Sequence, residues 1–116
     1  MNRGFYGQQP AYQQISPKEA QAMLESSDAV MIDVREPHEY QQVHAKGVKL
    51  IPLATVPDKL NEIPQDKTVL VICHSGGRSA YACDVLLSAG YDKAKVYNVM
   101  GGTAEWEYQG LPTEQG

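Results

Sequence analysis

One cysteine of this chain stands where a nucleophile would be expected. Cys73 follows the apolar, β-like run of residues 68–72 and precedes His-Ser-Gly-Gly-Arg at residues 74–78. Consecutive glycines let backbone N–H groups converge on one point, and the positive end of a helix that begins near Ser79 would face the same point. Only the thiolate form of a cysteine is nucleophilic, and positive potential favours that form. The pattern therefore predicts an anion-binding thiolate loop with Cys73 as its nucleophile.

The residues that follow Cys73 are the candidates for holding an anionic substrate. Their backbone amides would bind the developing negative charge, and Arg78 would bind the anionic end of the substrate. Two competing interpretations are that Arg78 is a solvent-exposed cation at a helix start and that His74 is a solvent-facing loop residue. The predicted substrate-binding set is His74, Ser75, Gly76, Gly77, Arg78 and Ser79.

The second cysteine, Cys83, is predicted to pack in the core. It lies at helical spacing from Ala80, Leu86 and Leu87, which favours an inward-facing stripe over a thiol that resolves an intermediate on Cys73. A chain of this length with two cysteines does not need a disulfide framework, and a reducing compartment suits a working thiol.

Beyond the loop, the chain resembles the rhodanese sulfurtransferases. A strand, a six-residue loop from Cys73 to Arg78 and a helix are similar to the active-site segment of that family. Residues 33–36, Asp-Val-Arg-Glu, are similar to its upstream signature, and residues 99–112, with Gly-Gly, Trp and Gly-x-Pro, are similar to its closing signature. Residues 43–52 match the family pattern only in part, at His44, Gly47, Ile51 and Pro52.

The resemblance implies a sulfurtransferase of the thiosulfate type. Cys73 would take sulfane sulfur from a small anionic donor such as thiosulfate, form a persulfide, and pass the sulfur to cyanide, a thiol or a protein cysteine. Arg78, together with His74 in its cationic form, would favour the doubly charged thiosulfate over mercaptopyruvate. Asp33 and Arg35 would give structural support to the site through buried polar contacts, the alternative being direct contact with substrate. No cofactor is implied.

Two other functions are compatible with the loop. One is a sulfur-carrier or regulatory rhodanese-like module that serves a protein partner, although retention of Cys73 disfavours a purely regulatory role. The other is a Cys-dependent phosphatase or arsenate reductase, whose loops resemble Cys-x5-Arg and are one residue longer. Four residues separate Cys73 from Arg78, which favours sulfur over a phosphoryl group.

Composition limits the partners of the chain. It has 116 residues, a formal charge of −4, and 42% hydrophobic residues, which predict one globular domain. The acidic balance disfavours nucleic acid, and the absence of a long apolar stretch disfavours a membrane span. No zinc-like spacing is present, so we predict no metal, and we interpret His38 and His44 as structural or surface groups. A cytoplasmic location is expected, and the oligomeric state stays open.

The elements that must position these residues alternate between strands and helices. Residues 1–11 are predicted to be a flexible extension and residues 12–116 the domain. The alternation predicts a three-layer α/β domain, in which helices flank a central, mostly parallel five-stranded sheet. Asp33, Cys73 and Gly101 would meet at its carboxyl edge. Strands are predicted near 12–15, 29–34, 48–51, 68–72 and 95–98, and helices near 17–25, 37–42, 56–61, 79–88 and 104–109.

Overall fold

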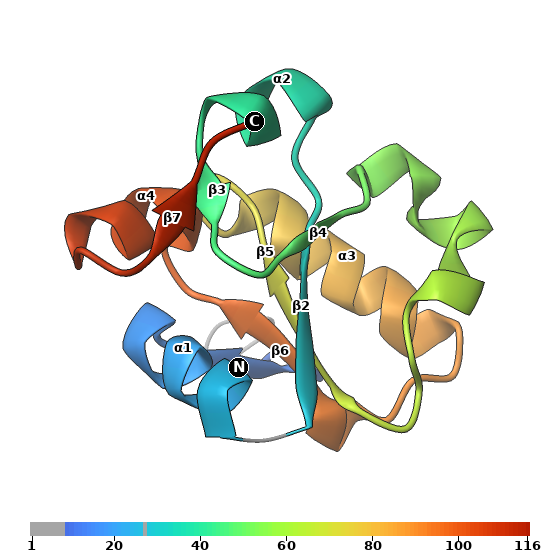
Figure 1. The fold of residues 1–116 in the computed structure, drawn as a ribbon. Helices are drawn as coiled ribbons and strands as arrows, with labels where there is room; N and C mark the ends of the chain where they lie inside the picture. The colour runs from blue at the N-terminus through green and yellow to red at the C-terminus, as the bar shows by residue number, and fades with distance from the viewer. Residues whose placement is uncertain (1–8, 27) are drawn as a thin grey trace, which may run out of the picture.

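Five parallel strands form the central sheet, in the order β1-β6-β5-β2-β4 (Figure 1). The computed structural model describes residues 9–26 and 28–116, so most of the predicted extension at residues 1–11 lies outside the described part. The parallel order confirms the predicted sheet. The strands are β1 (Gln13–Ile15), β2 (Ala29–Asp33), β4 (Lys49–Leu50), β5 (Thr68–Ile72) and β6 (Val96–Val99).

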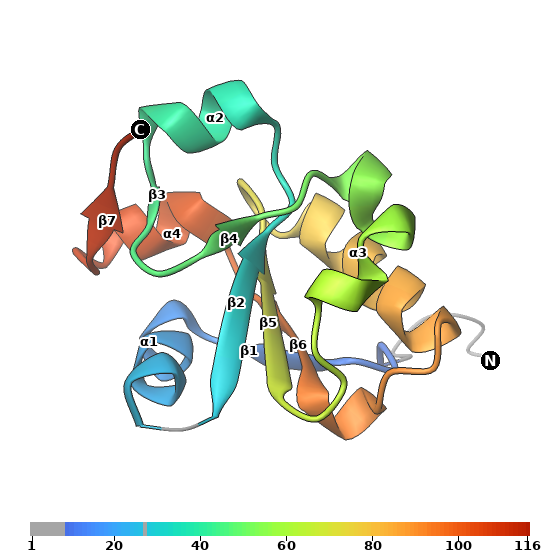
Figure 2. The same cartoon turned by 45° about the vertical axis from the view of Figure 1, so that its right-hand side comes forward.

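Helices cover both faces of the sheet and complete the three layers (Figures 1 and 2). The helices α1 (Pro17–Ser26) and α4 (Gly102–Tyr108) lie on one face, and α3 (Gly77–Ser88) lies on the other. A short helix, α2 (Pro37–Gln42), lies beyond the carboxyl ends of the strands. None of the helices in the described part is long and apolar enough to cross a membrane.

The alternation of side chains along β5 divides the core in two. Val69 and Val71 belong to the cluster on the α3 face, whereas Leu70 and Ile72 pack with Trp106 of α4 on the opposite face. All five side chains are fully buried. Because successive residues of a strand point to opposite faces, the residue after Ile72 points to the α3 face. The strand thus delivers Cys73 to the start of α3.

Three predicted helices differ from the observed ones at their ends or in their type. The helix predicted at 56–61 is a pair of 3-10 segments, Leu53–Asp58 and Leu60–Glu62. The first segment begins three residues earlier than predicted, so Pro57 lies near its end, where an α-helix would need the N–H that proline lacks. A third 3-10 turn spans Lys93–Lys95. Helices α3 and α4 each begin two residues earlier than predicted, directly after a glycine with positive φ.

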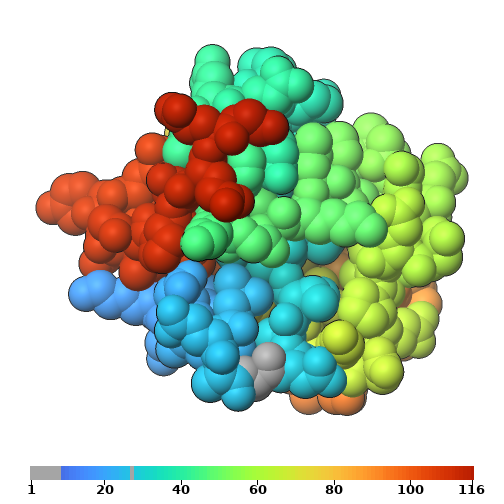
Figure 3. All heavy atoms as spheres, in the orientation of Figure 1, coloured from blue at the N-terminus to red at the C-terminus, as the bar shows by residue number. Residues whose placement is uncertain are grey.

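A second, two-stranded sheet was not predicted. In it, β3 (His44–Ala45) pairs antiparallel with β7 (Thr113–Glu114). The amide of Gly116 continues this contact by donating to the carbonyl of Gln41 at 2.9 Å. In Figure 3 the C-terminal segment accordingly covers β3 and the edge of α2. These pairings tie the end of the chain to the helix beyond the carboxyl edge of the main sheet.

The N-terminus of α4 approaches the Cys73 loop closely. The amides of Thr103 and Ala104 donate to the carbonyls of Cys73 and His74 at 2.8 and 3.1 Å. Gly102 has a φ of +60°, and a Cβ there would lie 2.5 Å from both of those carbonyl oxygens. Only glycine leaves room for this approach, so the closing Gly-Gly signature holds the backbone of the loop in place.

We predict that Gly102→Ala destabilises the fold more than the same change at Gly110. Both glycines have a positive φ, but a Cβ at Gly110 would meet nothing within 4 Å. Strain alone should make Gly110→Ala cost about 1–2 kcal/mol, whereas Gly102→Ala should cost about 2–4 kcal/mol because the carbonyls must also move. Denaturant unfolding of both variants measures the difference. Equal costs would show that α4 can move away from the loop without a loss of stability.

Candidate active site

The sulfur of Cys73 lies beneath the first turn of α3. The amide of Gly76 donates to Sγ at 3.0 Å, and Ser79 Oγ lies 3.3 Å from the same atom. Cys73 is only 1% exposed, so the sulfur contacts the loop more than it contacts solvent. This is the arrangement expected of the predicted thiolate loop, with the helix N-terminus directed at the sulfur.

The first glycine of the pair creates this arrangement. Gly76 has a φ of +113°, a conformation that glycine adopts without strain, and it is the N-cap of α3. Its carbonyl accepts from the amide of Ala80 at 3.2 Å, which starts the helix, while its own amide turns toward Sγ. Gly77 has no positive φ, and a Cβ there would meet nothing within 4 Å. The backbone therefore requires glycine at the first position only.

Two opposing effects set the acidity of the Cys73 thiol. Burial raises its pKa, because the charged form is poorly solvated. The hydroxyl of Ser79 and the backbone amides of Ser79, Gly76 and Ser75 stabilise the thiolate and together outweigh burial. The pKa of Cys73 is consequently lower than that of an ordinary cysteine. These contacts favour the thiolate, which is the nucleophilic form of a cysteine.

A buried asparagine on β6 holds the hydroxyl of Ser79. The single hydroxyl proton of Ser79 is shared between Oδ1 of Asn98, 2.6 Å from Oγ, and Sγ of Cys73, 3.3 Å from Oγ. Nδ2 of Asn98 donates to the carbonyl of Gly76 at 3.3 Å. One side chain thus orients both the hydroxyl and the turn that face the sulfur. Asn98 was not among the residues predicted for the site. The sequence feature that could have identified Asn98 is a polar side chain at the end of a predicted strand, directly before the apolar Val99.

The guanidinium of Arg78 is paired with a carboxylate. Nη1 and Nη2 of Arg78 donate to the two oxygens of Glu39 at 2.8 and 2.9 Å. Arg78 was predicted to bind the anionic end of a substrate or to be an exposed cation at a helix start, and in the structure a side chain of α2 supplies an anion to it. The hydrogen bonds from Arg78 lower the pKa of Glu39 to about 2, although burial opposes them. The sequence signal for Glu39 was its place at the third position of a helix that begins at Pro37.

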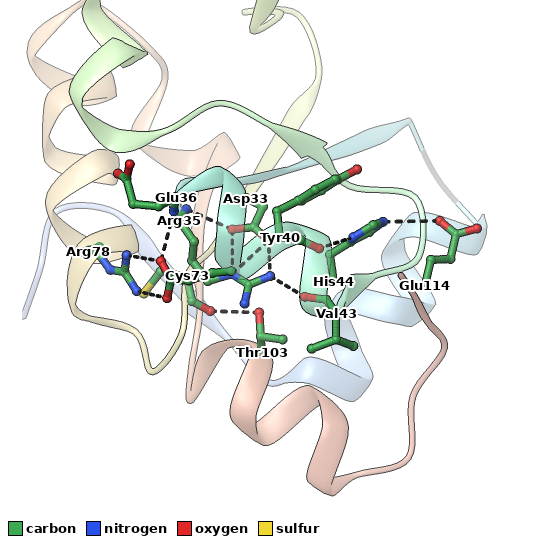
Figure 4. Close-up of polar contacts among 11 residues, drawn as sticks. Asp33, Arg35, Glu36, Tyr40, Val43, His44, Cys73, Arg78, Thr103 and Glu114 are labelled. Carbon is green, nitrogen blue, oxygen red and sulfur yellow. Dashed lines mark hydrogen bonds and ion pairs between the residues drawn. The ribbon is translucent and has the colours of Figure 1, made fainter. Parts of the chain in front are cut away.

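Asp33 and Arg35 form a buried ion pair beside the loop (Figure 4). Nη2 of Arg35 donates to Asp33 at 2.8 Å and to the carbonyl of Val43 at 2.8 Å. The amide of Arg35 also donates to Asp33 at 3.0 Å. These contacts join the end of β2 to the segment that enters β3, which is the kind of contact that a bracing role requires.

The remaining candidate residues of the loop lie at its surface. His74 and Ser75 are exposed; the amide of Ser75 acts on the sulfur, whereas the carbonyl of His74 accepts from the amide of Ala104. His44, in contrast, is buried, stacks on Tyr40 at 3.7 Å between ring centroids, and shares a hydrogen bond between Nδ1 and the carbonyl of Tyr40. Among residues 9–26 and 28–116, no group of three His, Cys, Asp or Glu side chains could hold a metal.

Cys83 packs in the core, as predicted. It is fully buried, it is not in a disulfide, and burial raises its pKa to about 12.

A groove of about 430 Å³ lies beside α3, the helix that begins at the loop. Its lining residues are Glu36, Leu53, Ala54, Pro57, Arg78, Tyr81 and Val85. Arg78 thus lies where the groove meets the loop.

Comparison with known proteins agrees with the geometry of the site. The family described as "Rhodanese-like domain" matches residues 16–109. A protein of Allochromatium vinosum named "Sulfurtransferase" is 34% identical over 93 residues, which cover 80% of this chain and 85% of that protein. "Thiosulfate sulfurtransferase GlpE" of Vibrio cholerae is 34% identical over 95 residues, which cover 82% of this chain and 88% of that protein.

A solved structure supports the fold in the same way. The crystal structure of a rhodanese-related protein from Thermoplasma volcanium aligns with a TM-score of 0.79 at 28% identity. The alignment covers 89% of this chain and 98% of that chain. The predicted fold class is confirmed.

We predict that Ser79→Ala raises the pKa of the Cys73 thiol, because the thiolate loses the hydroxyl that stabilises it. Alkylation by iodoacetamide, followed from pH 5 to 10, should shift to higher pH and be slowed about three- to tenfold at pH 7. Ser75→Ala is the matched control, since Ser75 stabilises the thiolate through its backbone amide. If both variants titrate like the wild type, the hydroxyl of Ser79 does not act on the sulfur.

Proposed function

Because the chain belongs to the rhodanese-like domain family, we propose that it is a sulfurtransferase that uses a persulfide on Cys73. It moves sulfane sulfur from an anionic donor such as thiosulfate to a thiophilic acceptor, as the names of its relatives suggest. The observation that carries the proposal is the buried sulfur of Cys73, which is surrounded by hydrogen-bond donors that lower its pKa.

In the first half-reaction the Cys73 thiolate attacks the outer sulfur of thiosulfate. A new sulfur–sulfur bond forms on Cys73 while the bond within the donor breaks, and sulfite leaves with the electron pair. The amides of Ser75, Gly76 and Ser79 already face the reacting sulfur. Donors that are oriented before the reaction stabilise developing charge without further rearrangement.

In the second half-reaction an acceptor attacks the outer sulfur of the persulfide. The bond to Cys73 breaks, and the thiolate leaves with the electron pair. A thiol of low pKa is a good leaving group, so the hydrogen bonds that generate the nucleophile also assist its release. Cyanide, a small thiol or a protein cysteine can serve as the acceptor.

Two features oppose phosphoryl transfer. The loop from Cys73 to Arg78 has six residues, which is one fewer than in the phosphatase pattern. In addition, both terminal nitrogens of Arg78 donate to Glu39. A phosphate dianion needs a bidentate cation of this type, and here that geometry is occupied by a carboxylate.

We predict that thiosulfate adds about 32 Da, the mass of one sulfur atom, to Cys73. Intact-protein and peptide mass spectrometry should find the adduct in the wild type and in Cys83→Ala, because Cys83 is buried and its pKa is raised to about 12. Cys73→Ser should show no adduct.

Two outcomes would redirect the proposal. Turnover of p-nitrophenyl phosphate without a sulfur adduct would replace sulfur transfer by phosphatase activity. An adduct that a protein cysteine accepts but that cyanide barely removes would identify a sulfur carrier rather than an enzyme of broad acceptor range.

A further inference from the structure

A carboxylate offsets the formal cation at the rim of the Cys73 loop. Glu39 accepts hydrogen bonds from both terminal nitrogens of Arg78, at 2.8 and 2.9 Å. Oε1 of Glu39 also accepts from the amide of Glu36 at 3.0 Å. The carboxylate is therefore held by the backbone at the N-cap of α2 as well as by its ion-pair partner.

The second ion pair beside the loop is balanced too. Asp33 and Arg35 neutralise each other, as Glu39 and Arg78 do, so these four side chains have a formal charge of zero. Glu39 remains ionised at neutral pH because its pKa is about 2. The attraction of the loop for anions then comes from partial charges on amides and on the N-terminus of α3, with no uncompensated formal cation among the four.

We propose that Glu39 is a specificity-determining residue that reduces the preference of the site for doubly charged sulfur donors. Donors with one negative charge, such as alkyl thiosulfonate anions, should then react with Cys73 at rates closer to the rate of thiosulfate. The inference rests on the proposed sulfur transfer through Cys73. It revises the expectation that Arg78 favours a dianion, because Glu39 repels the negative charge of the donor while Arg78 attracts it.

Arg78 still contributes to donor binding in this arrangement. A guanidinium has five N–H groups, and the two bonds to Glu39 leave the others available. Arg78 lies at the groove, with 37% of its side chain exposed. It can therefore donate hydrogen bonds to an oxygen of the donor while Glu39 cancels most of its long-range attraction. Hydrogen bonding and charge selection are thus separated between the two residues.

Thiosulfate and methanethiosulfonate form a suitable pair of probes. Both present an outer sulfur on a tetrahedral sulfur atom, and they differ in that a methyl group replaces one charged oxygen. In each case the Cys73 thiolate attacks the outer sulfur, and sulfite or methanesulfinate leaves with the electron pair. The same bonds form and break, so the ratio of the two rates reports mainly on donor charge.

The test compares the second-order rate constants of Cys73 persulfide formation for the two donors at pH 8, where an ordinary histidine is neutral. Glu39→Gln keeps an oxygen that can accept from Arg78 but removes the charge. We expect the rate ratio of thiosulfate to methanethiosulfonate to rise about three- to tenfold. We also expect this ratio to fall more steeply with added salt in the variant than in the wild type.

Glu36→Gln is the matched control, because it removes the same charge three residues away. Glu36 is exposed and lines the groove, but its carboxylate is not the partner of Arg78. Its effect on the ratio should be smaller than that of Glu39→Gln. An equal effect would show that general surface charge, not the ion pair, sets donor choice, and would overturn the proposal.

The remaining outcomes separate the two levels of inference. If Glu39→Gln slows both donors equally, with an unchanged ratio and salt dependence, Glu39 only supports the structure and the proposal is wrong. If the wild type forms no persulfide with either donor, the proposed function itself fails, and the role of Glu39 in it fails too. Circular dichroism and thermal unfolding establish that each variant is folded.

Discussion

The contact between Gly102 and the carbonyls of Cys73 and His74 is the constraint on which the site depends. Two strand-to-helix connections, β5 to α3 and β6 to α4, meet at this point, and the second can approach the first only because Gly102 has no side chain. The amides at the start of α4 then satisfy the carbonyls of the loop. With those carbonyls fixed on one side, the amides of the loop point the other way, toward the sulfur.

The electrostatic design of the site follows from that backbone geometry. Amides and the hydroxyl of Ser79 stabilise the thiolate against the cost of burial. The formal charges nearby are arranged in pairs, Asp33 with Arg35 and Glu39 with Arg78. Local dipoles therefore lower the pKa of Cys73, while the paired charges orient the surrounding segments. This division lets the loop favour the thiolate of Cys73 in a protein whose overall charge is negative, because dipoles act over short distances.

The features that the sequence predicted are those that local patterns encode. Apolar runs predicted the five strands of the main sheet, and their alternation with helices predicted that the sheet is parallel. The position of Cys73 between a strand and a glycine pair predicted that its sulfur lies at the start of a helix, as the contact with the amide of Gly76 bears out. The missed features depend on residues far apart in the chain: Glu39 meets Arg78 across 39 positions, and Asn98 meets Ser79 across 19. Their partners are set by the packing of whole elements, which no local pattern specifies.

The burial of Cys83 limits the reactions that are open to a sulfur atom on Cys73. Burial raises its pKa to about 12, which disfavours the thiolate, and the residue is fully buried in the core. On the proposed mechanism, a persulfide on Cys73 therefore meets no reactive thiol within the chain that could close a Cys73–Cys83 disulfide and release the outer sulfur as sulfide. The lifetime of such a persulfide would then be set by how often an external nucleophile reaches the loop.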